Sequence, residues 1–316
     1  MPPNHPDISV VIPLYNKEKS IERAIRSVLE QNKLPLEIIV IDDGSDDKSS
    51  EIAIDLQSKY SIIKYVRQSN QGVSVARNHG VAEAAADYIC FLDADDEWDP
   101  KFMRNLLNLM NIAEEADIFS LAYKMNSDKG IERAKVALPK GYTGYVKDPI
   151  NTYRKGYGLI CSSVVCMKKS FFLKMGGFPP GLIYGEDIYL WIKSFLFGKV
   201  AFSNLISATI HKEQINSKNR RKLQPYHILY FTHNLNEFEP TQRKAIKKFL
   251  VGNIYIQWAA AKLEDNKWQQ KTLQQYCFRL SKIKGLLLAA SALIPKSFIG
   301  YLKNRRTQKR LLSETH

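Results

Sequence analysis

Short apolar segments alternate with amphipathic ones through the first third of this 316-residue chain. Residues 8–12, 36–41, 62–66 and 88–92 have the apolar, largely β-branched composition of buried strands. The segments between them, such as 18–29, repeat apolar residues at helical spacing and therefore predict amphipathic helices. Strands that alternate with helices indicate an α/β fold with a doubly wound, mostly parallel sheet.

The middle of the chain is less regular. Residues 117–123 and 160–167 are expected to be strands, and the glycine- and lysine-rich stretch 128–158 is expected to form loops and short excursions. Residues 186–197 have a helical pattern, and 200–210 have the composition of a closing strand.

Charge divides the chain into two regions. Residues 1–211 are almost balanced, whereas residues 212–316 carry 21 Lys and Arg against six Asp and Glu. We therefore expect a globular α/β domain over 1–211 and a basic helical region over 212–316. Such a charge excess indicates an anionic partner, for example a membrane surface, a nucleic acid or an acidic polymer. No nucleic-acid-binding motif accompanies the charge, which argues against nucleic acid.

The basic region contains an apolar run over 286–294 that stops before Pro295. A membrane-spanning helix needs about 20 apolar residues, so this run is too short to cross a bilayer alone. With its basic flanks over 282–312, the segment suits a helix that lies in the headgroups of an anionic leaflet. The alternative is a terminal helix packed against the rest of the protein.

The expected location is cytoplasmic and peripheral, on the inner face of the membrane. The N-terminus lacks the basic start and apolar run of a signal peptide. The four cysteines are widely spaced, which favours reduced core thiols over disulfides or a zinc site.

Acidic residues follow two of the predicted strands. Asp42 and Asp43 come after the second strand, and Asp93-Ala94-Asp95-Asp96 comes after the fourth. One such turn alone is often a helix cap or a solvated loop. Two turns at the carboxyl ends of strands in a doubly wound sheet indicate a ligand site. Asp-x-Asp offers hard oxygen ligands to a divalent cation, which in turn binds substrate phosphates.

Together with three further motifs, these turns resemble glycosyltransferase family 2, whose members have the GT-A fold. The stretches that carry the resemblance are Val10-Val11-Ile12-Pro13-Leu14-Tyr15-Asn16, Ile41-Asp42-Asp43-Gly44-Ser45, residues 70–80, residues 91–96, and Gly185-Glu186-Asp187 with Trp191 one helical turn beyond. The resemblance implies an inverting, metal-dependent hexosyltransferase with a UDP-sugar as the expected donor. It also implies a saccharide or lipid-linked saccharide acceptor, as in the synthesis of surface polysaccharides.

The resemblance also assigns roles to individual residues. Asp187 would be the general base that takes the proton of the acceptor hydroxyl, and Glu186 would help to place the acceptor. Mn²⁺ or Mg²⁺ would be held by Asp95, with Asp93 and His211 close to it. The donor nucleotide and its phosphates would be bound by Pro13, Tyr15, Glu18, Asp42, Asp43, Arg77, Asp93 and Ala94.

Other interpretations of the same residues exist. Glu186 and Asp187 also suit the first turn of a helix, where carboxylates favour the helix dipole. A nucleotidyltransferase would carry a glycine-rich basic loop after its first strand, where this chain has Pro13-Leu14-Tyr15-Asn16. A non-catalytic nucleotide-sugar-binding or assembly scaffold protein is the remaining alternative, and the intact acidic residues argue against it.

Overall fold

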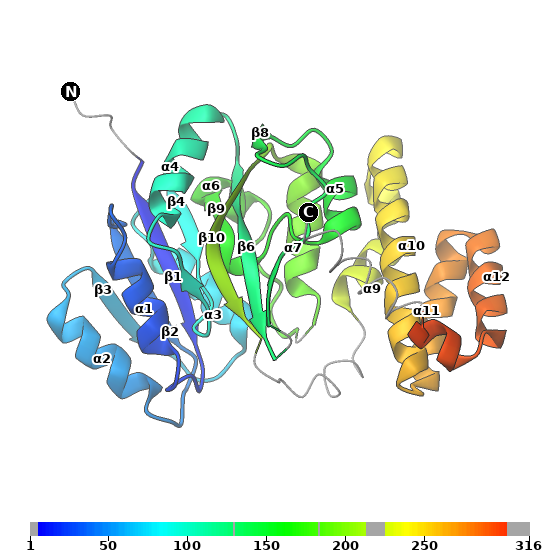
Figure 1. The fold of residues 1–316 in the computed structure, drawn as a ribbon, viewed down its shortest axis with the longest axis horizontal. Helices are drawn as coiled ribbons and strands as arrows, with labels where there is room; N and C mark the ends of the chain where they lie inside the picture. The colour runs from blue at the N-terminus through cyan, green and yellow to red at the C-terminus, as the bar shows by residue number, and fades with distance from the viewer. Residues whose placement is uncertain (1–5, 129, 183, 213–224, 302–316) are drawn as a thin grey trace. The chain divides into compact units, whose positions relative to one another are not determined.

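The computed structural model describes residues 6–128, 130–182, 184–212 and 225–301 (Figure 1). The chain divides into two compact units, Met1–Ile215 and Asn216–His316. The basic residues of the last segment beyond residue 301 lie outside the described residues.

The first unit is built on one mixed sheet. Its strands run in the order β3-β2-β1-β4-β9-β6-β10-β5, with β7 paired to β6 and β8 paired to β10. The strands are β1 (Ile8–Leu14), β2 (Glu37–Asp42), β3 (Ile63–Arg67), β4 (Tyr88–Phe91), β5 (Glu97–Trp98), β6 (Ile118–Ser127), β7 (Gly130–Arg133), β8 (Thr143–Tyr145), β9 (Val165–Lys168) and β10 (Val200–His211).

The first four strands are parallel, and this decides where the acidic turns meet. Strand β1 lies between β2 and β4 and pairs in parallel with both, so that Leu14 is opposite Asp42 and Val11 is opposite Phe91. The carboxyl ends of β1, β2 and β4 therefore lie at one edge of the sheet. Strands β6 and β10 are also parallel, whereas β9 runs antiparallel between β4 and β6. The α/β class with a mostly parallel central sheet is confirmed.

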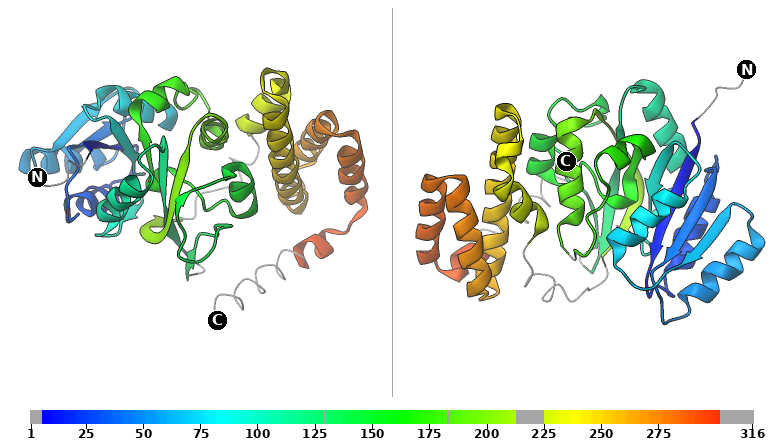
Figure 2. Two further views of the ribbon diagram at one scale, coloured as in Figure 1. Left: turned by 90° about the horizontal axis from the view of Figure 1, so that it is seen from above. Right: turned by 180° about the vertical axis from the view of Figure 1, so that it is seen from behind.

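Helices cover both faces of this sheet (Figures 1 and 2). The helices of the first unit are α1 (Ile21–Leu29), α2 (Ser49–Lys59), α3 (Val73–Glu83), α4 (Phe102–Ile112), α5 (Pro149–Gly156), the 3₁₀ turn η1 (Ser162–Val164), α6 (Lys169–Lys174) and α7 (Glu186–Phe197).

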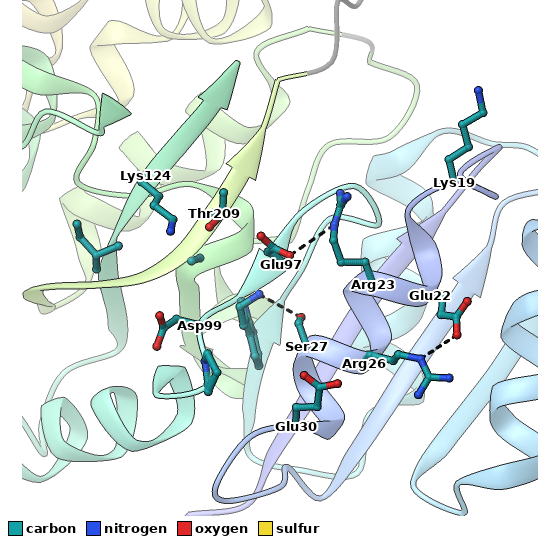
Figure 3. A pocket seen from close by; sticks show the side chains of 14 residues that line it. Lys19, Glu22, Arg23, Arg26, Ser27, Glu30, Glu97, Asp99, Lys124 and Thr209 are labelled. Carbon is teal, nitrogen blue, oxygen red and sulfur yellow. Dashed lines mark hydrogen bonds and ion pairs between the residues drawn. The ribbon is translucent and has the colours of Figure 1, made fainter. Parts of the chain in front are cut away.

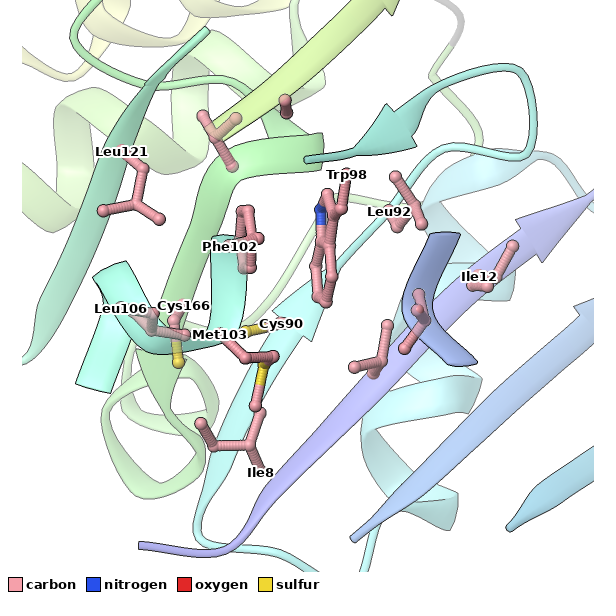
Figure 4. Packing of buried hydrophobic residues seen from close by; sticks show 14 of the residues in the cluster. Ile8, Ile12, Cys90, Leu92, Trp98, Phe102, Met103, Leu106, Leu121 and Cys166 are labelled. Carbon is pink, nitrogen blue, oxygen red and sulfur yellow. The ribbon is translucent and has the colours of Figure 1, made fainter. Parts of the chain in front are cut away.

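The main core lies between the sheet and helices α1, α2 and α4. Figure 4 shows the part of it around β1, β4 and α4. Ile12 of β1, Ile25 of α1 and Phe102 of α4 are fully buried members of this cluster. The Trp98 and Phe102 rings stack there with their centroids 3.7 Å apart, which anchors the start of α4 to the end of β5.

On the other face, α3 packs closely against β1. A Cβ atom at Gly80 would lie 2.3 Å from Cγ1 of Val11, so only glycine permits this approach. Phe178 packs edge-on against Phe91 of β4 and Trp191 of α7, with ring centroids 5.5 and 5.7 Å apart. This contact attaches α7, which begins at Glu186, to the centre of the sheet.

The stretch 128–158 is more ordered than its composition predicts. Besides loops it contains two strands, β7 and β8, and the eight-residue helix α5. Helix α5 begins with the cap of Asp148, whose carboxylate accepts from the Asn151 N–H, and with Pro149 in the first turn. The expected strand 160–167 is also different, because the 3₁₀ turn η1 occupies its middle and β9 starts only at Val165.

The second unit is helical. Its elements are α9 (Tyr226–His233), η2 (Leu235–Glu237), α10 (Pro240–Leu263), α11 (Lys267–Leu280), α12 (Lys282–Ala290) and η3 (Ser291–Leu293). A capping box between Glu239 and Gln242 starts α10. Among the described residues, no helix is both long and apolar enough to span a membrane.

Candidate functional site

A buried arginine lies at the centre of the sheet edge where the acidic turns meet. Arg77 of α3 is 5% exposed, and its Nη2 donates to Asp93 Oδ1 over 2.6 Å. Its guanidinium carbon also lies 5.0 Å from the centroid of the Phe178 ring. Burial opposes the charge, yet the carboxylates of Asp93, Glu186 and Asp187 raise the pKa of Arg77 above its usual value.

Asp187, in the first turn of α7, interacts electrostatically with both members of this pair. It is partly buried, and its Oδ1 accepts from the Ile188 N–H over 2.6 Å. Burial raises the pKa of Asp187 above the usual aspartate value, and the nearby Asp93 carboxylate adds to the increase. The Ile188 hydrogen bond and the positive charge of Arg77 act in the opposite direction. Asp187 is therefore a carboxyl group whose pKa is raised mainly by burial, and its role as general base stays a prediction.

Asp95, the other aspartate of the Asp-x-Asp turn, contacts one cation through its carboxylate and a second through its backbone carbonyl. Lys17 Nζ lies 2.6 Å from Asp95 Oδ2, and Arg23 Nη2 donates to the Asp95 carbonyl over 2.5 Å. The sequence reasoning missed Lys17. Its position one residue after Asn16, at the end of the first strand, was the only available signal.

His211 lies at the end of β10. Its backbone contacts the acidic turn, whereas its imidazole ring contacts Glu97, which follows that turn. Its Nε2 is 3.2 Å from Glu97 Oε1, and its backbone N–H donates to Asp96 Oδ1 over 2.9 Å. In the part of the chain that the structure describes, no three His, Cys, Asp or Glu side chains gather into a metal-binding group. The metal roles expected of Asp93, Asp95 and His211 stay predictions.

Asp42 and Asp43 both have protein partners. Asp42 accepts from Ser50 Oγ and the Tyr65 hydroxyl, each over 2.6 Å. Burial alone would raise the pKa of Asp42, but its hydrogen bonds outweigh burial and lower it. Asp43 accepts from the N–H groups of Gln71 and Gly72, each over 2.8 Å. These bonds connect the end of β2 to the start of α3.

The chain that follows β1 interlocks with the chain that follows β2. Asn16 has a left-handed backbone, with φ of 51°. Its side chain accepts from the Asp46 N–H, and the Glu18 carboxylate accepts from the Lys48 N–H. The Tyr15 side chain is 45% exposed beside these contacts, so it is accessible to a ligand. Pro13, in β1, and Ala94, in the acidic turn, are both buried.

Asn78 is a second residue that sequence reasoning missed. Its Nδ2 donates to the Phe178 carbonyl over 2.7 Å, and its Oδ1 accepts from the Phe178 N–H over 2.9 Å. These two hydrogen bonds connect α3 to the turn that leads toward α7. A Cβ at Gly177, where φ is +67°, would come within 2.7 Å of the same Oδ1. The sequence feature that indicates this close approach is the pair of adjacent glycines, Gly176 and Gly177.

A polar hollow of about 690 Å³ opens nearby, between α1, the end of β5 and strands β6 and β10 (Figure 3). Lys124, Arg23 and Glu97 line it, and none of the site residues predicted from the sequence does. The hollow is therefore distinct from the arrangement around Arg77.

The chain belongs to glycosyl transferase family 2, because the model of that family matches residues 9–172. Together with the fold, this membership makes the protein a glycosyltransferase.

Curated proteins of similar sequence agree. An uncharacterized glycosyltransferase of Rickettsia typhi is 28% identical over 71% of this chain and 70% of its own length. The glycosyltransferase GlyA of Streptococcus pneumoniae is 30% identical over 62% of this chain, and the match spans 29% of that protein.

Solved structures share the fold. Residues 1–349 of TarS from S. aureus, crystallised in complex with UDP-GlcNAc, superpose with a TM-score of 0.70 at 18% identity. The match covers 88% of this chain and 82% of that one. The resemblance to family 2 and the GT-A fold expected from the sequence are thus confirmed.

Proposed function

We propose that the protein is an inverting glycosyltransferase that moves a sugar from a nucleotide diphosphate donor to a saccharide or lipid-linked saccharide acceptor. The observation that carries the proposal is the electrostatic interaction of the Asp187 carboxyl, in the first turn of α7, with the buried ion pair of Arg77 and Asp93. Residues 1–211 form the catalytic domain in this proposal, and UDP-sugar is the proposed donor. The UDP-GlcNAc complex of TarS, which shares the fold, supports the choice of UDP.

Asp187 takes the proton in the proposed reaction. The acceptor hydroxyl attacks the anomeric carbon while the bond from that carbon to the diphosphate oxygen breaks. The hydroxyl proton passes to the Asp187 carboxylate, and the nucleoside diphosphate leaves with the electron pair. The raised pKa of Asp187 makes its carboxylate a better proton acceptor than an exposed one. Attack from the side opposite the leaving group inverts the anomeric centre.

The donor side of the site carries the positive charge that a diphosphate requires. Arg77 and Lys17 contact the two carboxylates of the Asp-x-Asp turn, one cation to each. Tyr15 is exposed at the neighbouring strand end, where a nucleoside can contact its ring. Glu186 would orient the acceptor next to Asp187.

The residues at this turn fit a divalent cation. Asp95 presents an oxygen ligand that already contacts the ammonium group of Lys17, and Mg²⁺ commonly takes only one or two carboxylates because substrate phosphates complete its shell. Asp95 and Asp93 would hold Mn²⁺ or Mg²⁺. The ion, when bound, would neutralise negative charge on the diphosphate.

The experiment is a transfer assay with a panel of UDP-, GDP- and dTDP-sugars and saccharide acceptors, with nucleotide release as the readout. With a UDP-sugar as donor, we expect nucleotide release to be faster in the presence of acceptor than in its absence. The configuration of the product, assigned by proton NMR coupling constants, should be opposite to that of the donor. Retention would contradict the single displacement, and nucleotide binding without any transfer would favour a scaffold.

For the basic region 212–316 we propose association with an anionic membrane surface, which would locate the enzyme at the inner face of the membrane. One side of α12 supports this, because Ile283, Leu286 and Leu287 are 71%, 63% and 52% exposed. Lys282 and Lys284 flank them in the same helix. Exposed apolar side chains beside lysines suit the headgroup region of such a leaflet.

A sedimentation assay with vesicles of phosphatidylcholine and phosphatidylglycerol tests this role. Leu286→Ser with Leu287→Ser should reduce the bound fraction. Leu205→Ser is the matched control, because Leu205 is also 52% exposed but belongs to β10. Equal binding of all variants would contradict the proposed surface.

A further inference from the structure

Ser163 contacts the acidic turn at two points. Its hydroxyl donates to Asp96 Oδ2 over 2.5 Å and accepts from the Asp93 N–H over 3.1 Å. Ser163 is fully buried in η1, and Asp96 is only 3% exposed. The serine hydroxyl thus uses both its donor and its acceptor capacity to bind the first and last residues of the turn 93–96.

Asp96 extends this connection to a third segment of the chain. Its Oδ1 accepts from the His211 N–H at the end of β10 over 2.9 Å. In addition, Trp98 Nε1 donates to the Ser163 carbonyl over 2.7 Å. The segment before β9, the acidic turn and the end of β10 are therefore joined through two side chains, Ser163 and Asp96.

The consequence concerns the carboxylate of Asp93. The hydrogen bond that the Asp93 N–H donates to Ser163 Oγ holds the backbone of Asp93, and the Asp93 side chain accepts from Arg77. Without the hydroxyl, the part-buried Asp93 N–H and the buried Asp96 Oδ2 would both lose a hydrogen-bond partner, which is costly inside a protein. The turn would then adopt other conformations, and the two cation-paired carboxylates would no longer be held in one arrangement.

We propose that Ser163 and Asp96 are positioning residues that hold the Asp-x-Asp turn in its donor-binding conformation. The inference rests on the proposed function, because it assigns donor binding to this turn. Neither residue contacts substrate in this account; both act through Asp93 and Asp95. Misplacement of a binding group by about 1 Å can lower a rate by about a hundredfold.

Hydrogen–deuterium exchange of the full chain tests the structural half of the proposal without any assay of activity. In Ser163→Ala, exchange in peptides covering 91–98 should be about tenfold faster, with the remaining sheet unchanged. Ser120→Ala is the matched control, because Ser120 is a fully buried serine whose hydroxyl has no hydrogen-bond partner. Unchanged exchange in 91–98, or equally faster exchange throughout the sheet, would overturn the proposal.

Substitutions at Asp96 test the catalytic half. Asp96→Asn keeps a carbonyl oxygen for the His211 N–H and an amide that can bond to Ser163 Oγ. We expect kcat/KM within about threefold of wild type for Asp96→Asn and a loss of about 10- to 100-fold for Asp96→Ala, with a raised KM for the donor.

The two variants also separate this inference from the proposed function. If Asp96→Asn loses activity as completely as Asp96→Ala while it remains folded, the carboxylate acts directly and the positioning role is wrong. If Ser163→Ala does not fold, the comparison of Asp96→Asn with Asp96→Ala still decides. Absence of transfer by the wild-type protein contradicts the proposed function alone, because the exchange result stands independently.

Discussion

Arg77 Nη2 and Asp93 Oδ1 lie 2.6 Å apart and join the 70–80 motif to the Asp-x-Asp turn. The arginine is almost completely buried, and Phe178 lies against its guanidinium group. A buried cation needs such partners, because burial of an unpaired charge is very costly. The pair therefore connects the 70–80 motif on α3 to the acidic turn after β4. Through Phe178, the same arginine also contacts the segment before α7.

Arg77→Lys tests the importance of this geometry. Lysine keeps the charge but loses the planar guanidinium that both pairs with a carboxylate and stacks on a ring. We expect kcat/KM to fall by about 10- to 100-fold, measured as nucleotide release at subsaturating donor. Arg26→Lys is the control, since Arg26 forms an exposed pair with Glu22, and it should retain wild-type kinetics. Equal activity of both variants would remove Arg77 from the site.

Asn78→Asp tests the connection between α3 and the turn before α7. The aspartate can still accept from the Phe178 N–H, but it cannot donate to the Phe178 carbonyl and instead repels it. We expect a loss of about 1–3 kcal/mol in the free energy of unfolding, measured by urea denaturation. Asn108→Asp, at an exposed position of α4, should change it little. A similar stability of both variants would show that the Asn78 bonds are weak.

The metal role is tested by chelation. If Asp93 and Asp95 hold Mn²⁺ or Mg²⁺ together with the donor phosphates, EDTA should abolish transfer and added Mn²⁺ or Mg²⁺ should restore it. Asp95→Asn should raise the metal concentration needed for half-maximal rate. Full transfer in EDTA would contradict the role, and Lys17 would then be the cation that serves Asp95.

The rate should also depend on pH through Asp187. The charged side chains that act on the Asp187 carboxyl are Arg77, which lowers its pKa, and Asp93, which raises it. Because burial raises the pKa of Asp187, the base becomes protonated at a higher pH than an ordinary aspartate with a pKa of about 3.9. We expect kcat to be constant at high pH. As the pH is lowered, kcat should begin to fall at a pH above the ordinary aspartate value. A rate that stays constant down to about pH 4 would contradict a raised pKa at the base.

The parallel half of the sheet could be predicted from sequence, because each strand there is a continuous apolar run that ends in a distinctive turn. The stretch 128–158 could not, since β7 and β8 are short edge strands whose pairing with β6 and β10 is a tertiary property. Helix α5 does have a start signal in the sequence, because Asp148 suits the N-cap and Pro149 the first turn. The glycine- and lysine-rich composition of the stretch favoured loops instead.

The site divides in the same way. The acidic turns and Arg77 were recognisable because they belong to local motifs. The contacts of Lys17 with Asp95 and of Ser163 with Asp93 join residues far apart in the chain, so no local pattern predicts them. His211 illustrates the limit, because its position at the end of β10 was foreseeable but its Glu97 partner was not.

The most direct test of the proposed mechanism is Asp187→Asn, assayed for transfer and for donor binding by calorimetry. Transfer should fall by about 10²- to 10⁴-fold, because the amide cannot accept the hydroxyl proton. The dissociation constant of the donor should stay close to that of wild type, and the midpoint of thermal unfolding at neutral pH should rise, since the variant no longer keeps an ionised carboxyl in an unfavourable site. Transfer at the wild-type rate, or loss of donor binding, would contradict Asp187 as the general base.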